Sequence, residues 1–265
     1  MRSNADSFYW DRNIAKYIVK RLKEPHTLPF FYGLGFIGPH NPFTPSLKYW
    51  NRTGDSSAKE MLPQDSSGTI SPHFIGNGSG NIELPSTPPN DRRDVPRFEF
   101  FGGQYLPSDS EWRRIIHAYD AEVAQTDAQL GYVLDEIDRQ NLWANTVIVF
   151  FGDHGQHLGE HEGVWKKNTL FEESLHIPLI ICAPGKQGDK KCSKIVELED
   201  IYPTLLELCS LPPLSTLEGS SLVPLLDNST LIWKRAAFSQ LKRILKDGSI
   251  VMGRSIRTDQ YRYTS

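Results

Sequence analysis

Apolar residues recur at helical spacing in two long segments of the chain. In residues 11–23, DRNIAKYIVKRLK, four aliphatic residues fall on one face and cations on the other, which predicts an amphipathic helix. Residues 108–140 repeat the pattern over more turns, and Ser108 or Asp109 can cap this second helix. Its apolar stripe consists of Trp112, Ile115, Ile116, Tyr119, Val123, Leu130, Val133, Leu134 and Ile137.

Continuous apolar runs predict three strands, LPFFYGLGF at 28–36, NTVIVFFGD at 145–153 and HIPLIICAPG at 176–185. The last two lack polar alternation, which indicates burial on both faces and a mostly parallel sheet. Residues 198–213 predict a helix in which Pro203 is tolerated in the first turn. The alternation of strands and helices predicts an α/β protein with a mostly parallel central sheet flanked by helices.

Amino-acid composition indicates a long loop and bears on the domain boundaries. Residues 41–107 are rich in Pro, Ser, Asn and Gly, so we expect a long irregular loop, of the kind that is usually functional or disordered. We expect one α/β domain over 1–213 and the start of a smaller, truncated C-terminal α+β subdomain over 214–265. The final residues, SIRTDQYRYTS, predict one more strand.

Charge and motif content exclude several classes of protein. The formal net charge is -3 without any basic block, so we expect no nucleic-acid partner. No apolar run approaches the roughly 20 residues of a membrane-spanning helix, and the first residues lack the apolar core of a signal peptide. The three cysteines form no recognisable metal or disulfide pattern. Sequons at Asn51, Asn77 and Asn228 are typical of proteins that follow the secretory route.

Candidate chemistry stands at the end of the second predicted strand. The run VIVFFGDHGQHLGEHEGVWKK places Asp153 and His154 directly after apolar residues, where the active sites of α/β sheets collect. An Asp-His pair in a loop is otherwise solvated or bonded to backbone in about two cases in three. Gly152 and Gly155 permit a sharp turn beside a ligand, Asp and His are both metal-binding residue types, and Lys167 offers a cation for an oxyanion.

A second candidate, His40, follows the first predicted strand in GLGFIGPHNPF. Pro39 and Pro42 stiffen this segment. A lone histidine there is more often structural than catalytic, but two strand ends that each present a histidine predict a shared site. We therefore expect His40, Asp153, His154 and Lys167 to converge.

These motifs together resemble the sulfatase family of the alkaline phosphatase superfamily. The family order is Asp-His-Gly, Gly-Glu-His, Trp-x-Lys, then Pro-Leu-Ile and Pro-Gly, as in GDHGQHLGEHEGVWKKNTLFEESLHIPLIICAPG, and GFIGPHNPF is similar to its Pro-His-x-Pro-Phe segment. The tail VMGRSIRTDQYRYT resembles the iduronate 2-sulfatase subgroup. The resemblance covers nearly the whole chain, loosely over 41–107.

The resemblance implies roles for single residues. Asp153 and His154 correspond to metal-site residues, with Ca²⁺ the expected ion. His40 and Lys167 correspond to catalytic residues that contact the sulfate ester, and Lys167 is chosen because the family places its lysine two positions after the tryptophan, here Trp165. His157, Glu160 and His161 receive no site role; the last two match the motif and are expected to shape the loop.

The chain also departs from the family pattern. The nucleophile, a Cys or Ser in Cys/Ser-x-Pro/Ala-x-Arg that becomes formylglycine, is absent, as are the Asp-Asp pair and the Lys-x-x-His of the first part. CAPGK at Cys182 is rejected because it lies in a predicted strand and ends in Lys. Gly38 replaces a lysine of the iduronate 2-sulfatase subgroup. We therefore expect the second part of a sulfatase, which alone binds calcium weakly and releases no sulfate.

Three functions remain open. The first is a sulfuric ester hydrolase acting on sulfated saccharides in a lysosomal or secreted setting, where a metal ion and cations stabilise charge on the departing oxygen and His40 or His154 shares a proton with it. The second is a phosphatase or phosphodiesterase of the same superfamily, although the additional Asp and His residues of a two-metal site are missing. The third is a non-catalytic binder of sulfated glycans, favoured by the missing nucleophile.

Overall fold

The computed structural model describes residues 10–51, 109–244 and 247–265. Most of the predicted loop over 41–107, and the sequon at Asn77, lie outside these ranges. The described residues form two compact units, one containing 10–51, 109–143 and 158–164 and the other containing 144–157 and the described residues from 165 onward. Within the described ranges, no helix combines the length and apolar character needed to cross a membrane.

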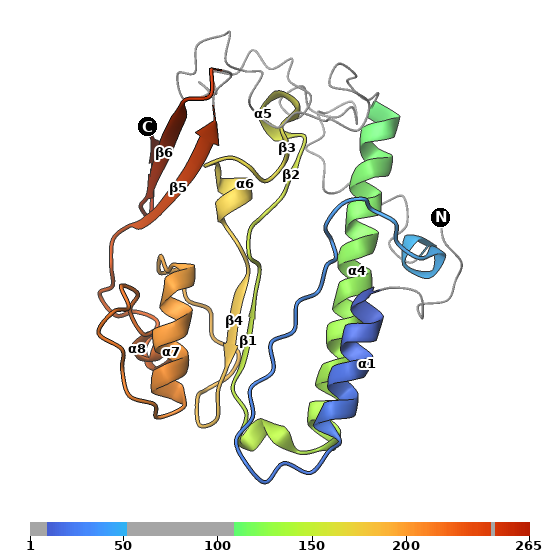
Figure 1. Cartoon of the computed structure of the whole chain (residues 1–265), viewed down its shortest axis with the longest axis vertical. Helices are drawn as coiled ribbons and strands as arrows, with labels where there is room; N and C mark the ends of the chain where they lie inside the picture. Colours follow the sequence, from blue (N-terminus) through green and yellow to red (C-terminus); the bar gives the residue numbers. More distant parts are fainter. Residues whose placement is uncertain (1–9, 52–108, 245–246) are drawn as a thin grey trace. The chain divides into compact units, whose positions relative to one another are not determined.

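Two helices build the first unit, and both confirm the helical patterns in the sequence. Helix α1 (Trp10–Leu22) and helix α4 (Asp109–Arg139) pack side by side (Figure 1). Residues one or two turns apart meet at their interface because i and i+4 share a helix face. The buried apolar residues are Ala15, Ile18, Val19 and Leu22 of α1 and Trp112, Ile116, Ala121, Val133 and Ile137 of α4.

The middle of α4 departs from the predicted apolar stripe. Val123 is 41% exposed, whereas Glu122, Gln125 and Gln129 are buried. The buried amides have partners, since Gln129 Nε2 donates to the Gln125 carbonyl at 3.2 Å and Gln129 Oε1 accepts from Arg12 at 3.4 Å. Polar side chains therefore occupy inward positions that hydrophobic spacing assigns to apolar ones.

The segment 28–36 is not the buried strand that its apolar residues predict. It runs extended without a ladder, and Leu28 and Phe31 are exposed. Its aromatic rings instead contact one another at alternate positions, with Phe30 4.4 Å from His26 and 4.9 Å from Tyr32 between ring centroids. An apolar run specifies an extended chain but not the partner strand that would complete a ladder.

The second unit contains the two other predicted strands, shorter than expected. Strands β1 (Ile148–Phe151) and β4 (Leu179–Cys182) pair with Ile148 opposite Cys182 (Figure 1). The pair is antiparallel, whereas the two-sided apolar pattern predicted parallel neighbours, and Phe151 and Ile180 are exposed. The prediction of burial on both faces is therefore wrong for these two residues, and apolar residues on both faces carry no information on strand direction.

The other elements between α4 and residue 237 are short. They are η4 (Leu142–Ala144), β2 (His157–Leu158), α5 (Glu160–Gly163), β3 (Trp165–Lys166), α6 (Glu172–Leu175), η5 (Leu198–Asp200), α7 (Ile201–Leu208) and α8 (Val223–Asp227). The predicted helix over 198–213 thus corresponds to η5 and α7, and Pro203 lies in the first turn of α7. Ser210 has a positive φ, and the Leu211 N–H donates to the Leu206 carbonyl at 2.8 Å, which ends the helix.

An antiparallel meander closes the chain. Strands β5 (Ala237–Ile244), β6 (Ile250–Arg257) and β7 (Arg262–Thr264) pair in that order. The segment SIRTDQYRYTS, predicted as one strand, instead contains the end of β6, a turn and β7, and in the turn the Thr258 N–H donates to the Tyr261 carbonyl at 2.7 Å. The predicted boundary at 213/214 stays a prediction.

A buried ion pair lies between η5 and the segment before β5. Lys234 Nζ lies 2.7 Å from Asp200 and 2.6 Å from Glu197 carboxylate oxygens. Asp200 is fully buried and also accepts from the N–H groups of Glu197 at 2.7 Å and Ser220 at 2.8 Å. These bonds satisfy a carboxylate that would otherwise be costly to bury.

Candidate active site

Asp153 and His154 begin where the β1–β4 ladder ends. Gly152 N still donates to the Pro178 carbonyl at 3.1 Å, and the chain turns away at the next residue. The Asp153 side chain is 84% exposed, and the His154 side chain is partly buried. The end of a rigid strand thus presents both residues, as the sequence predicted.

The local hydrogen bonds orient the two side chains toward each other. Asp153 Oδ1 accepts from the His154 N–H at 3.0 Å, and His154 Nδ1 lies 2.9 Å from the Gly155 carbonyl. In a neutral imidazole the proton therefore sits on Nδ1 and a lone pair on Nε2. That Nε2 lies 3.5 Å from Asp153 Oδ2. Both atoms carry lone pairs, so a proton or a cation bound between them would stabilise this arrangement.

This donor set fits a divalent cation. The exposed Asp153 carboxylate supplies a hard oxygen of the kind that Ca²⁺ and Mg²⁺ prefer, while an imidazole nitrogen is more typical of transition metals. Calcium takes about six to eight oxygen ligands, so Asp153 and His154 alone do not fill its shell. Calcium as the specific ion stays a prediction.

Gly155 is required by contact with protein rather than with a ligand. Its N–H donates to the Ser174 carbonyl at 2.8 Å, and a Cβ at this position would overlap the Glu173 carbonyl oxygen. Gly152 is less constrained, because a Cβ there would come no closer than 3.3 Å to its nearest neighbour, Pro178 Cδ. The Gly155 backbone therefore holds the Asp153–His154 turn directly against α6.

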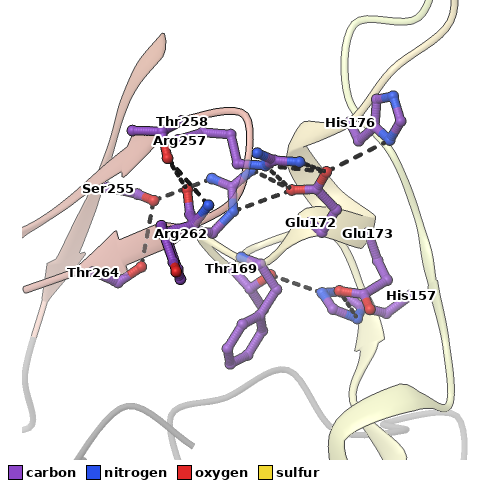
Figure 2. Close-up of polar contacts among 12 residues, drawn as sticks. His157, Thr169, Glu172, Glu173, His176, Ser255, Arg257, Thr258, Arg262 and Thr264 are labelled. Atoms are coloured by element: carbon purple, nitrogen blue, oxygen red, sulfur yellow. Dashed lines mark hydrogen bonds and ion pairs between the residues drawn. The ribbon is translucent and has the colours of Figure 1, made fainter. Parts of the chain in front are cut away.

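A buried hydrogen-bond network around His157 supports the chain just after the Asp153–His154 turn (Figure 2). The fully buried His157 places Nε2 2.7 Å from the Thr169 hydroxyl, which lies 2.9 Å from the Ser174 hydroxyl. His157 Nδ1 lies 3.9 Å from a Glu173 carboxylate oxygen. The sequence assigned no role to His157, and neither Thr169 nor Ser174 belongs to a motif, so only the structure reveals this support.

Lys167 lies on a loop that contacts the same hydrogen-bond network through Thr169. Lys166, the last residue of β3, adopts a left-handed φ of 69°, and the Thr169 N–H donates to the Lys167 carbonyl at 2.8 Å. Thr169 is the residue that contacts His157. The structure therefore connects the loop of Lys167 with the loop of Asp153 and His154 through a side-chain contact, and Lys167 itself is partly buried.

A charged cluster joins α6 to the C-terminal meander (Figure 2). Glu172 accepts from Arg257 Nε at 3.0 Å and from Arg262 Nη2 at 2.6 Å, and Arg262 Nη1 donates to Ser255 Oγ at 3.1 Å. Burial opposes ionisation of Glu172, but hydrogen bonds from both arginines outweigh it and lower its pKa. The cluster places the meander against the helix that supports Gly155.

His40 belongs to the other unit, on the segment after 28–36. It is exposed, its N–H donates to the Ile37 carbonyl at 2.8 Å, and its Nδ1 lies 2.6 Å from the Asn41 carbonyl. The structure thus brings together the loops of Asp153, His154 and Lys167. Convergence of His40 with them stays a prediction.

Glu160 behaves as the sequence analysis expected of a loop-shaping residue, and the same role for His161 stays a prediction. The Glu160 carboxylate accepts from the Leu158 N–H at 2.7 Å, and the Gly159 N–H donates to the Val164 carbonyl at 3.0 Å, so this segment closes on itself. The rejected nucleophile, Cys182, lies within β4 opposite Ile148. Its place in the ladder agrees with that rejection.

Comparison with known proteins decides the family. The sulfatase family model matches residues 2–211. The chain belongs to the sulfatase family. A second model, described as the C-terminal part of N-sulphoglucosamine sulphohydrolase, matches residues 159–265 of this sulfatase chain.

Curated sulfatases resemble the chain along part of their length. A sulfatase of Formosa agariphila is 31% identical over 225 residues, which are 85% of this chain and 41% of that protein. Arylsulfatase K of Gallus gallus is 41% identical over 116 residues, 44% of this chain and 22% of that protein. The chain therefore spans less than half the length of these relatives. Particular closeness to iduronate 2-sulfatase stays a prediction.

Solved structures share the fold at low sequence identity. BT4656, solved in complex with D-Glucosamine-2-N, 6-O-disulfate, aligns with a TM-score of 0.71 and 19% identity over 97% of this chain and 60% of that chain. A phosphonate monoester hydrolase of Agrobacterium radiobacter aligns with a TM-score of 0.68 and 24% identity over 95% of this chain and 51% of that chain. These likenesses confirm the predicted α/β fold class.

Proposed function

We propose that the chain forms part of an enzyme that hydrolyses sulfate esters, with a sulfated saccharide as substrate. The observation that carries the proposal is the pairing of Asp153 and His154 at the end of β1, on a turn connected through His157 and Thr169 to the loop of Lys167. An exposed carboxylate and the ammonium group of a lysine on the connected loop suit a metal-bound sulfate, whose oxygens carry negative charge.

Each residue has a separate role in this proposal. Asp153 and His154 hold a divalent cation, with Ca²⁺ proposed, which would stabilise charge on the sulfuryl oxygens. Lys167 contacts a sulfate oxygen as a point charge. His40, which is exposed, contacts the ester and exchanges a proton with the departing oxygen.

The test is sulfate release from an aryl sulfate and from sulfated disaccharides, including one with a 2-sulfated iduronate. We would assay the native protein purified from its source and the 265-residue chain in parallel. Asp153→Asn and Lys167→Gln should each lower kcat/KM at least 100-fold in the active form, a loss of the size expected when a group that stabilises transition-state charge is removed. Lys191→Gln, on the exposed surface, is the matched control. Unchanged activity in both site variants would contradict the assignment.

A phosphonate ester is a second substrate class to assay, because a phosphonate monoester hydrolase shares the fold. Hydrolysis of a phosphonate monoester at a higher kcat/KM than an aryl sulfate would favour it. Binding of sulfated disaccharides by the native protein without turnover would favour a non-catalytic glycan binder.

We further propose that the protein resides in the lysosome or is secreted. Asn228 is exposed at the end of α8, and its Oδ1 accepts from the Thr230 N–H at 3.0 Å and from the Thr230 hydroxyl at 2.7 Å. The sequon is therefore displayed on an accessible turn. Peptide:N-glycosidase treatment of the native protein should reduce its mass, and an unchanged mass together with a cytosolic fractionation pattern would contradict the proposal.

A further inference from the structure

Two buried carboxylates lie beside the segment that carries His40. Asp11 of α1 is 5% exposed and Glu122 of α4 is 7% exposed. Neither residue belongs to the proposed site. Burying a carboxyl group costs free energy unless its oxygens accept hydrogen bonds. The hydrogen-bond partners of Asp11 and Glu122 therefore indicate the role of these two residues.

Asp11 binds the chain immediately before His40. Its Oδ1 accepts from the Ile37 N–H at 2.7 Å, and its Oδ2 accepts from the Gly38 N–H at 2.9 Å. The same turn is closed by the His40 N–H, which donates to the Ile37 carbonyl at 2.8 Å. One carboxylate therefore fixes two consecutive N–H groups at the base of the turn that presents His40.

Helix α4 binds the chain immediately after His40. Glu122 Oε1 accepts from the Thr44 N–H at 2.8 Å, and Gln125 Oε1 accepts from the Ser46 N–H at 3.0 Å. Between these residues and His40, the Phe43 ring lies edge-on to Tyr119 of α4 with centroids 5.5 Å apart. The segment 37–46 is thus held on both sides of an exposed histidine.

We propose that Asp11 and Glu122 are positioning residues that fix the segment 37–46 and thereby the location of His40. The chemical role of His40 rests on the proposed function, whereas the fixing of the segment does not. The two acids act through backbone N–H groups and contact no substrate. They add α1 and α4, which the sequence motifs do not include, to the elements that position His40.

Gly38 is part of the same arrangement. A Cβ there would overlap the Thr126 hydroxyl and lie 2.9 Å from Asp11 Oδ2. A side chain at this position would therefore displace the Thr126 hydroxyl and crowd the Asp11 carboxylate. Gly38 permits the close approach that lets Asp11 bind two N–H groups.

Protonation of Glu122 does not remove its role as an acceptor. Burial raises its pKa to about 7, the negative charge of Asp11 adds to the increase, and the Thr44 N–H opposes it. The protonated and the ionised carboxyl group both keep an oxygen that accepts from the Thr44 N–H, so an amide at this position should preserve the contact.

Hydrogen exchange of the 265-residue chain tests the proposal without using activity. Asp11→Asn leaves one oxygen for two N–H donors, and Glu122→Ala removes an acceptor. Each should accelerate exchange in 37–46 about tenfold, since a lost hydrogen bond of ordinary strength has that effect on a local opening equilibrium. Glu122→Gln keeps an acceptor oxygen and should stay within about twofold of the parent protein. Asp127→Asn, exposed on α4, is the control.

The His40 imidazole provides a readout that general loosening would not move. Its ¹³C–¹H resonance should change in Asp11→Asn and Glu122→Ala and be restored in Glu122→Gln. Exchange that rises equally in α1, α4 and 37–46, or a His40 resonance that is unchanged in both disruptive variants, would overturn the proposal. If the native protein released no sulfate, the proposed function would be refuted. The hydrogen-exchange test of the segment 37–46 would still decide the positioning role, because it does not depend on activity.

Discussion

The Gly155 N–H donates to the Ser174 carbonyl at 2.8 Å, and the space that a side chain at 155 would need is taken by the Glu173 carbonyl oxygen. Gly155→Ala should therefore separate the Asp153–His154 turn from α6. We expect a loss of about 1–3 kcal/mol in the free energy of unfolding, as in other overpacked sites, measured by urea denaturation.

The control for Gly155→Ala is Gly188→Ala, because no atom lies within 4 Å of a Cβ at 188. It should change the free energy of unfolding by less than about 0.5 kcal/mol. Calcium binding should weaken in the 155 variant alone. Equal stability and calcium affinity in the two variants would show that the Gly155 contact does not support the turn.

The Glu172–Arg262 interaction should contribute about 1 kcal/mol, because Glu172 is 42% exposed and solvent screens the pair. A double-mutant cycle with Glu172→Gln and Arg262→Gln measures this coupling. Since the Glu172 pKa is lowered from 4.5, its contribution is present above pH 4.5 and is lost as pH falls below that value. The coupling should shrink in 1 M salt; a coupling near zero at low salt would contradict the prediction.

Lys234→Met should be more damaging than loss of an exposed ion pair. It leaves the fully buried Asp200 without its cation, and breaking a buried pair costs about 3–5 kcal/mol. Lys186→Met is the matched control, since Lys186 pairs with the exposed Asp227 at 2.6 Å and should cost less than about 1 kcal/mol. Thermal unfolding of both variants would measure the difference in stability. Similar losses of stability would contradict the prediction and mean that the buried Asp200 does not need a cation beside it.

Glu122 should make stability depend on pH near neutrality. Its pKa is raised from 4.5 to about 7 in the folded protein. For an acid shifted upward, the stability is fully present below the unfolded pKa and is lost as pH rises through the folded value. The loss should be at most about 3 kcal/mol between pH 4.5 and 8.

Glu122→Gln removes the titrating group and should flatten that part of the pH profile. Asp127→Asn, which changes an exposed acid on the same helix, should leave the profile as it is. Urea denaturation at intervals of pH measures all three proteins. If the free energy of unfolding of Glu122→Gln still fell with pH as in the parent protein, another group would be responsible for the pH dependence.

Sequence spacing predicted the elements that depend on local pattern. Helices α1 and α4 follow from i, i+4 spacing, and β1 from its apolar run, so the site of Asp153 and His154 after β1 was predictable. Spacing could not predict the direction of β4 or the absence of a ladder at 28–36, because pairing depends on residues far away in the chain. It also misplaced Val123, since the polar contacts of the neighbouring Glu122 decide which face of α4 turns inward.

The supports of the site were not predictable for a related reason. Thr169 and Ser174 are ordinary residues whose importance comes from the buried His157 earlier in the chain. Arg257 and Arg262 were expected in a strand, but their shared partner, Glu172, lies at separations of 85 and 90 residues. Such pairs are set by tertiary packing, which no local pattern records.

The polar interior of α4 has a consequence for engineering and for natural drift. A designer who sought a more stable variant would replace Glu122 or Gln125 with leucine, since both are inward-facing on a helix. Such a change would leave the Thr44 or Ser46 N–H without its acceptor, which costs about 1–3 kcal/mol for a buried donor. A rule that fills inward-facing helix positions with leucine would therefore lower the free energy of unfolding at these two positions.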